Sequence, residues 1–191
     1  MAARQVVISN TVNGPYINAF AALDFDKDGC YNTPAIDAQG NVNPGLECGG
    51  ALNGHCRDKE DLENNNVYSR ARCNNGWCIF MYAYYFEKDQ TALWTCGVGH
   101  KHDWEHIAVW VKDDVAVYVS VSQHKGWDCR EAKDVRWHQG NHPKAVYHQD
   151  GGLTHDFRFA NTKDDDIENH MGVWFVSFGF PSFPRSPLAL I

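Results

Sequence analysis

The sequence predicts a mainly β protein folded as one domain over residues 1–191, with 1–4 expected to be an added or disordered start. Two observations favour this fold: apolar and other residues alternate with a period of two in the middle of the chain, and the first third is rich in turn-forming glycine and proline. Several short strands joined by long loops are typical of a β-sandwich with limited helix.

The first third of the chain predicts one short helix and a long loop region. Ile17, Phe20 and Leu23 fall near helical spacing, so we expect a helix over residues Ile17–Leu23. Residues Asn32–Gly54 contain Pro and Gly at many positions and predict turns.

The rest of the chain predicts strands. Residues His106–Lys112 and Val115–Ser122 alternate with a period of two, and Asp113-Asp114 between them predicts a hairpin turn. Residues Gly172–Phe180 are rich in β-branched and aromatic side chains and predict a last strand.

The charge of the chain excludes several classes of partner. The net charge is −7, from 24 acidic and 17 basic residues, and the basic residues form no cluster. Nucleic-acid binding depends on neutralising phosphates, so we expect no nucleic-acid partner. Polybasic docking on an anionic membrane is excluded for the same reason. No apolar run reaches the roughly 18 residues of a membrane-spanning helix.

The seven cysteines indicate an oxidising, extracellular compartment. Cys73 and Cys78 lack the spacing of a zinc knuckle, so we favour disulfides over metal thiolates. Seven is an odd number, so at least one thiol is free or pairs with another chain. The connectivity stays open at this point.

The densest polar cluster is Gly99–His106, which contains five potential metal ligands: His100, His102, Asp103, Glu105 and His106. Carboxylates favour Mg²⁺, Ca²⁺ or Mn²⁺, and imidazoles favour Zn²⁺. In an extended strand His100 and Asp103 face opposite sides, so a shared ion requires a bend or bulge, for which Gly97 and Gly99 supply freedom. The alternative is a solvated polar end of a strand.

An enzymatic interpretation has less support. A metal-dependent hydrolase of glycans or esters has the right residue types here, but the HxHxDH and HExxH spacings are absent. No GxSxG motif supports a nucleophilic serine. We therefore expect no catalytic residue and no enzyme activity.

Other polar and aromatic residues are weaker candidates. Asp24-x-Asp26-x-Asp28-Gly29 begins like a calcium-binding EF-hand loop, but a polar turn is the simpler interpretation because Ala35 occupies the position of the expected glutamate. Trp94, Trp127 and Trp137 lie among glycine and polar residues, where a tryptophan serves either the core or a sugar or membrane contact. We add further candidates for a sugar, head-group or membrane contact: His102, His124, His155 and Asp156.

Two motifs carry a resemblance to a known family. Residues Gly99–Glu105 (GHKHDWE) resemble the hallmark heptapeptide of the necrosis- and ethylene-inducing-like proteins (NLPs), with Lys101 in place of the usual arginine. Residues Ile79–Asp89 (IFMYAYYFEKD) resemble the second signature of that family, with Glu87 in place of proline. The resemblance runs from about Asp24 to the C-terminus.

The resemblance implies a fold and a function. It implies a β-sandwich flanked by helices, similar to actinoporins and fungal lectins, in a secreted virulence protein of plant-associated microbes. NLP cytolysins bind glycosylinositol phosphorylceramide, a sphingolipid in the outer leaflet of the plant plasma membrane, and then permeabilise that membrane. We accordingly expect a monomeric plant-directed toxin that acts at the host membrane. Some members are not toxic, so a non-lytic, lectin-like protein is the third alternative.

The resemblance also implies particular residue roles. A divalent cation, Mg²⁺ or Ca²⁺ before Mn²⁺ or Zn²⁺, is expected on Asp89, His100, Asp103 and Glu105. Family disulfides match Cys30 with Cys56 and Cys73 with Cys78, whereas Cys48, Cys96 and Cys129 lie outside the pattern. Residues Gln90–Val98 form a longer stretch than in comparable members. The resemblance leaves open which loop enters the membrane.

Overall fold

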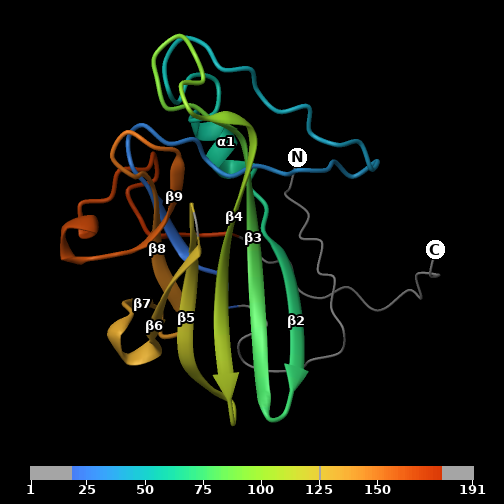
Figure 1. Ribbon diagram of the computed structural model, residues 1–191, viewed down its shortest axis with the longest axis vertical. Helices are drawn as coiled ribbons and strands as arrows, with labels where there is room; N and C mark the ends of the chain where they lie inside the picture. The colour runs from blue at the N-terminus through green and yellow to red at the C-terminus, as the bar shows by residue number, and fades with distance from the viewer. Residues whose placement is uncertain (1–18, 125, 178–191) are drawn as a thin grey trace.

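The computed structural model describes residues 19–124 and 126–177, and in these residues the fold is two packed β-sheets (Figure 1). The first sheet is antiparallel throughout, in the order β2 (Tyr68–Asn74), β3 (Trp77–Asp89), β4 (His100–Lys112), β5 (Val115–Gln123), β6 (Gly126–Glu131). The second sheet has the order β10 (Phe175–Val176), β1 (Ala22–Phe25), β8 (His142–Gln149), β7 (Trp137–His138), and β9 (His155–Phe159) also pairs with β8. The β1–β8 pair is parallel.

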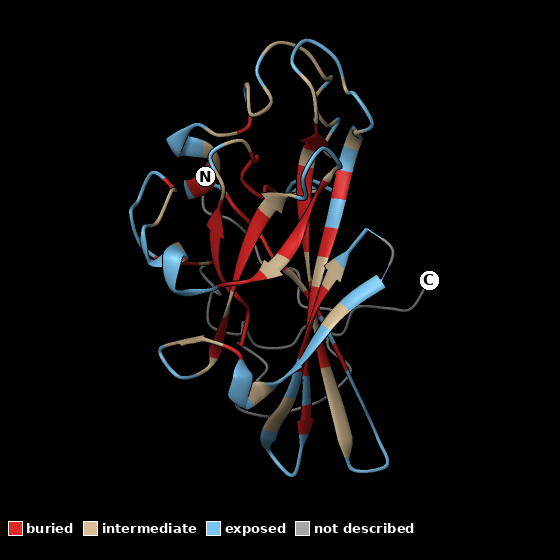
Figure 2. Ribbon diagram, turned by 60° about the vertical axis from the view of Figure 1, so that its left-hand side comes forward, coloured by how far each residue is buried: buried red, intermediate tan, exposed pale blue. Residues whose placement is uncertain are grey.

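The core lies between the two sheets. Inward-facing Tyr82 and Val109 of the first sheet are fully buried, as are Phe25 and Tyr147 of the second, and all four belong to one hydrophobic cluster. Figure 2 shows buried residues along the strands and exposed residues in the connecting loops. Burial of this shared apolar face is the main force that holds the sheets together.

The predicted strand pair and its turn are confirmed. β4 and β5 pair antiparallel, and both turn residues, Asp113 (φ 50°) and Asp114 (φ 60°), have the left-handed conformation of a tight two-residue hairpin. β4 begins at His100, six residues before the expected start at His106, because the inward-facing positions of that first half hold acids that the hydrophobic period does not reveal.

The helix expected at Ile17–Leu23 is wrong in the residues that the structure describes. Residues Ala22–Phe25 form β1, a strand with neighbours on both sides and four buried residues in a row. A central strand buried on both faces has no alternation, and periodicity alone does not separate it from a short helix. Ile17 and Asn18 at the start of that range lie outside the described residues, as do residues 1–4.

Helices contribute little to the described part of the chain. It contains one α-helix, α1 (Lys59–Glu63), and two 3₁₀ turns, η1 (Ala132–Asp134) and η2 (Thr162–Asp165). The mainly β class is therefore confirmed. The flanking helices implied by the resemblance are not confirmed, since α1 is the one α-helix in this part of the chain. The expected strand Gly172–Phe180 is found only as Phe175–Val176, and residues 178–180 lie outside the description.

Three disulfides cross-link the described residues, and one of them joins the paired strands β2 and β3. Cys30–Cys56 and Cys73–Cys78 are the pairs that the resemblance implied, and Cys48–Cys96 is a third. Cys129 on β6 is free and exposed, which accounts for the odd cysteine. The Cys48–Cys96 bridge joins the glycine-rich first loop region to the connection between β3 and β4, at the upper end of the molecule in Figure 1.

Candidate metal centre

Two strands bring three potential ligands together at one end of the sandwich. Asp89 ends β3 and His100 begins β4, and the two residues are partners in the antiparallel ladder. One ligand atom from each of Asp89, His100 and Asp103 lies within 4.8 Å of the other two. Ligands on opposite sides of one Mg²⁺ or Ca²⁺ ion are about 4–5 Å apart, so this spacing fits a single hard cation.

The bend that the site requires is present, and it lies at His102. The ladder pairs Lys88 with Lys101 and Phe86 with Asp103, but leaves Glu87 and His102 without a Cα partner. His102 has φ 61°, a left-handed conformation that interrupts the regular alternation of β4. His100 and Asp103 therefore reach a common site, although a regular strand would place them on opposite faces.

Buried negative charge distinguishes this end of the sandwich. Asp89, Asp103 and Glu105 are exposed by only 1%, 6% and 8%. Burial, followed by the charge of Asp89, raises the pKa of Asp103 to about 6, and burial, followed by the charge of Asp103, raises the pKa of Glu105 to about 9. In the described residues no lysine or arginine forms an ion pair with Asp103 or Glu105. A bound cation would supply the missing positive charge.

Hydrogen bonds orient the carboxylates of the site. His155 binds Asp89 twice, with its ring Nδ1 2.7 Å from Oδ1 and its backbone N–H donating to Oδ2 at 2.9 Å. The Tyr147 hydroxyl donates to Asp103 Oδ2 at 2.9 Å, and the Ser122 hydroxyl donates to Glu105 Oε2. Second partners of this kind fix ligand orientation in metal sites, and each carboxylate oxygen keeps a further lone pair for an ion.

Glu105 has a different environment from the three convergent residues. It lies two residues after Asp103 on the same face of β4, and its carboxylate contacts Ser122 of β5. Its pKa is also raised by the charges of Asp156 and Asp89, which places it beside the same group of acidic residues. The arrangement suits Glu105 to act on the ion through water.

His155, one of the candidate head-group residues, contacts the candidate ligand Asp89, and Asp156, another, follows it on β9. His155 also lies 3.6 Å from Asp28, and although burial lowers its pKa, the hydrogen bonds to Asp28 and Asp89 outweigh that effect and raise it to about 9. Asp156 is buried between two histidines: its carboxylate lies 3.1 Å from His148 Nε2 and 3.5 Å from His124 Nε2.

The other candidates have partners outside the three convergent residues. His102 faces the outer side of the sheet, where its Nδ1 is 2.7 Å from the Tyr85 hydroxyl. Trp127 is 49% exposed on β6, opposite Ser122. Trp137 on β7 donates its indole N–H to the Ala132 carbonyl at 2.8 Å and packs against the core. It pairs with Pro143 at the start of β8.

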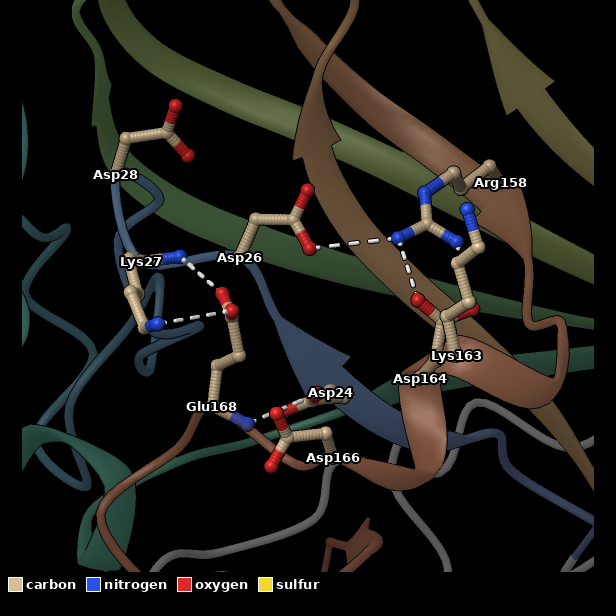
Figure 3. A pocket seen from close by; sticks show the side chains of 9 residues that line it. All are labelled: Asp24, Asp26, Lys27, Asp28, Arg158, Lys163, Asp164, Asp166 and Glu168. Carbon is tan, nitrogen blue, oxygen red and sulfur yellow. Dashed lines mark hydrogen bonds and ion pairs between the residues drawn. The ribbon is translucent and has the colours of Figure 1, made fainter.

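An acidic pocket forms around the Asp24–Asp28 turn (Figure 3). It measures about 410 Å³, and six acidic side chains line it together with Lys27, Arg158 and Lys163. Asp24 accepts bonds from the Glu168 backbone and the Asn169 side chain, and Asp26 pairs with Arg158 at 3.4 Å. Asp28 lies 3.6 Å from His155 Nε2. The three aspartates serve separate partners, as the interpretation as a polar turn requires.

Sequence reasoning missed two of the supporting residues. Tyr147 gave no signal, because a tyrosine in a buried strand is ordinary, and only the packing of β8 against β4 brings its hydroxyl to Asp103. Asp28 was considered only as a calcium ligand, and its contact with His155 is a tertiary one. Ser122 lies in the expected strand Val115–Ser122, but its bond to Glu105 requires the paired strands.

Together these observations define a mainly β protein with a candidate divalent-cation site at one end of its sandwich. The chain belongs to the necrosis inducing protein (NPP1) family, whose profile matches residues 18–180. The family resemblance drawn from the two sequence motifs is therefore confirmed.

Individual relatives support the assignment. The chain is 33% identical over 153 residues to NLP effector protein 10 of Phytophthora capsici, a match that covers 77% of this chain and 62% of that protein. The chain thus spans less than two thirds of the length of this curated relative. None of the helices in the described residues is long and apolar enough to cross a bilayer.

Solved structures share the fold. A structure described as a "toxin fold as basis for microbial attack and plant defense" matches with a TM-score of 0.66 at 32% identity, over 75% of this chain and 66% of that one. NLPPya in complex with mannosamine matches with a TM-score of 0.65 at 30% identity, over 81% and 77%. The non-toxic HaNLP3 protein matches with a TM-score of 0.64 at 25% identity, over 76% and 67%.

Proposed function

We propose that the protein is a secreted, plant-directed cytolysin that binds the sugar head group of glycosylinositol phosphorylceramide at a divalent cation and then permeabilises the plasma membrane. The observation that carries the proposal is the convergence of Asp89, His100 and Asp103 within 4.8 Å. The cation proposed is Mg²⁺ or Ca²⁺, because two of the three donors are carboxylates.

The residues of the site would have different roles in binding the ion. Asp89, His100 and Asp103 would hold the ion, and Glu105 would bind it through water. When bound, the ion offers exchangeable positions to sugar hydroxyls and offsets the acidic surface where an anionic lipid approaches. His155 and Tyr147 would keep Asp89 and Asp103 oriented. This mechanism requires no nucleophile and no turnover.

Sugar recognition has support from a relative. NLPPya, which shares the fold at 30% identity, is described in complex with mannosamine. Head-group binding to many lipids at once would concentrate the protein on the membrane by avidity, so even a weak sugar contact suffices for targeting.

The decisive measurement is dye release from phosphatidylcholine vesicles with and without glycosylinositol phosphorylceramide. We expect release only with the sphingolipid, loss of release after chelation, and recovery with Mg²⁺ or Ca²⁺. Asp103→Ala should abolish release and metal binding while the circular dichroism spectrum stays unchanged, because a ligand is lost and the apolar core is not. Asp114→Asn is the matched control, since it removes one carboxylate at the other end of β4.

The alternatives give different results. Full release by a folded, metal-free Asp103→Ala protein would contradict the site. A chelator-sensitive product from a glycan or ester would favour the metal-dependent hydrolase. Metal-dependent sugar binding without release would favour the non-lytic, lectin-like protein, a class for which the similarity to the non-toxic HaNLP3 protein is the supporting observation.

A further inference from the structure

The connection between β3 and β4 exposes the largest apolar side chains beside the candidate metal centre. Leu93 is 63% exposed, Trp94 80% and Val98 65%, all within ten residues. The sequence from Gln90 to Val98 has no charged residue, although the whole chain carries a net charge of −7. An uncharged apolar tip on an acidic protein is suited to a membrane interface, where tryptophan is favoured and a buried charge is costly.

The tip is a tight turn with a defined shape. Ala92 and Thr95 form an antiparallel bridge, which makes Leu93 and Trp94 the two central residues of the turn. Trp94 has φ 67°, a left-handed conformation that is unfavourable for a bulky side chain. Such a conformation persists only where surrounding contacts hold it, and it presents the indole to solvent.

Several contacts hold the turn against the neighbouring loop. The Trp94 backbone N–H donates to the Gly50 carbonyl at 2.9 Å, and the Cys48–Cys96 disulfide joins the same two loops. Beneath the turn, the Gln90 amide donates to the Ala92 carbonyl at 2.8 Å. Buried Lys88 donates to Gln90 Oε1 at 3.0 Å, which anchors the base of the loop.

The base of the turn is the metal centre itself. Asp89 and His100, two of the three convergent ligands, are the partners that close the loop. At Gly99 a Cβ atom would lie 1.9 Å from the Asp89 carbonyl oxygen, so only glycine permits this closure. Leu93 is the fourth residue after Asp89, so its Cα lies at most about 14 Å from that of Asp89. Any head group that reaches the site brings the lipid surface within reach of Trp94.

We infer that Leu93 and Trp94 form a membrane-insertion tip, which enters the outer leaflet when the adjacent cation site holds a sphingolipid head group. The inference rests on the proposed function and names the segment that carries out its second step. The contacts keep the tip ordered before binding, so little conformational freedom is lost when it inserts. Figure 1 shows the two linked loops together at one end of the molecule, beyond α1.

The test uses Trp94→Asn, because asparagine tolerates the left-handed conformation and removes the indole without straining the turn. The matched control is Val115→Ser, which removes an apolar side chain that is 61% exposed at the opposite end of β4 and β5. Each protein is titrated with glucosamine and Mg²⁺ by calorimetry and added to dye-loaded phosphatidylcholine vesicles with glycosylinositol phosphorylceramide. We expect Trp94→Asn to bind the sugar as the wild type does, but to require at least about tenfold more protein for half-maximal release.

A second measurement reports insertion directly. Brominated lipids quench a tryptophan that enters the bilayer, and Trp94→Phe keeps an aromatic ring at the tip while removing that fluorophore. We expect Trp94→Phe to keep most of the release and to lose most of the quenching. Release and quenching unchanged in the Trp94 variants would overturn the tip while leaving the proposed function intact.

The remaining outcomes are equally distinct. The wild-type protein could show neither metal-dependent sugar binding nor sphingolipid-dependent release. That result would contradict the proposed function and, with it, the membrane-insertion tip. Sedimentation could show that the wild type is a dimer and that Trp94→Asn is a monomer. That result would assign the tip to self-association and overturn membrane insertion.

Discussion

The two halves of β4 share one strand and one face of the sheet, yet their inward-facing positions hold opposite chemistry. In the half that starts at His100, the inward positions are Asp103 and Glu105; in the other half they are Ile107, Val109 and Val111. All five residues are buried. The apolar half adds to the hydrophobic core, whereas the acidic half collects negative charge that the folded protein retains at a cost in stability.

The contrast supports the proposed cation site in the acidic half. Buried carboxylates without a cation weaken a fold, and the pKa values of Asp103 and Glu105 are raised because burial and mutual repulsion oppose their ionisation. A metal ion would turn the same groups into stabilising contacts. Three predictions test this comparison.

The largest effect should come from moving an acid into the apolar half. Val109→Asp places a carboxylate at a fully buried position among core side chains, without the hydrogen bonds that Asp103 receives. We expect a loss of more than about 4 kcal/mol in the free energy of unfolding, enough to prevent folding. Soluble expression and thermal melting measure this. A folded Val109→Asp protein with near-normal stability would show that the apolar half of β4 tolerates a buried carboxylate as well as the acidic half does.

The pH dependence of the metal-free protein should be the next largest effect. The folded pKa values of Asp103, Glu105 and His155 are all raised, to about 6, 9 and 9, so the folded state binds more protons than the unfolded state. These groups therefore favour folding below their ordinary pKa values, and that stability is lost as pH rises toward the folded values. Asp103 alone accounts for about 3 kcal/mol, lost mainly between pH 4 and 6.

Chemical denaturation in a chelator, from pH 5 to pH 9, measures this slope. We expect stability to fall as pH rises in the metal-free protein, and saturating Mg²⁺ or Ca²⁺ to offset the loss at neutral pH. Asp103→Asn with Glu105→Gln should give a shallower slope in chelator. A metal-free wild type whose stability rises across this range would contradict the assignment of buried acids.

The smallest effect concerns the partner that orients a ligand. His155→Ala removes the ring contact to Asp89 Oδ1 but leaves the backbone N–H bonded to Oδ2. We expect metal affinity to fall by about tenfold, within the range typical of lost second partners. Calorimetric titration measures it, with His138→Ala on β7 as the control. Equal metal affinity in wild type and His155→Ala would show that the backbone bond alone suffices.

Much of the fold was predictable where local patterns decide it. The alternation in residues 106–122 marked the β4–β5 hairpin, because a strand with one buried face repeats every two residues. β1 was mistaken for a helix because a central strand buried on both faces has no such repeat. The first half of β4 lay outside the expected strand His106–Lys112, because its inward residues are acids that the hydrophobic period does not mark.

The residues of the candidate site were likewise predictable only in part. Asp103 and His100 stood out because they are close in sequence, and Asp89 entered through a family motif. Tyr147 and Asp28 were missed as supporting residues because their contacts join strands and loops that are distant along the chain. Trp94 was one of several tryptophans in polar surroundings, and only the turn around it shows that it is exposed beside the ligands.

The sequence by itself determined which residue types are available: a dense run of acids and imidazoles, seven cysteines and an alternating apolar pattern that requires sheets. The tertiary structure alone decided which of them meet. Strand pairing places Asp89 opposite His100, and the left-handed residue His102 brings Asp103 to the same side. The reason is geometric: a ligand set depends on distances between side chains, and these are defined only when separate strands pair in one register.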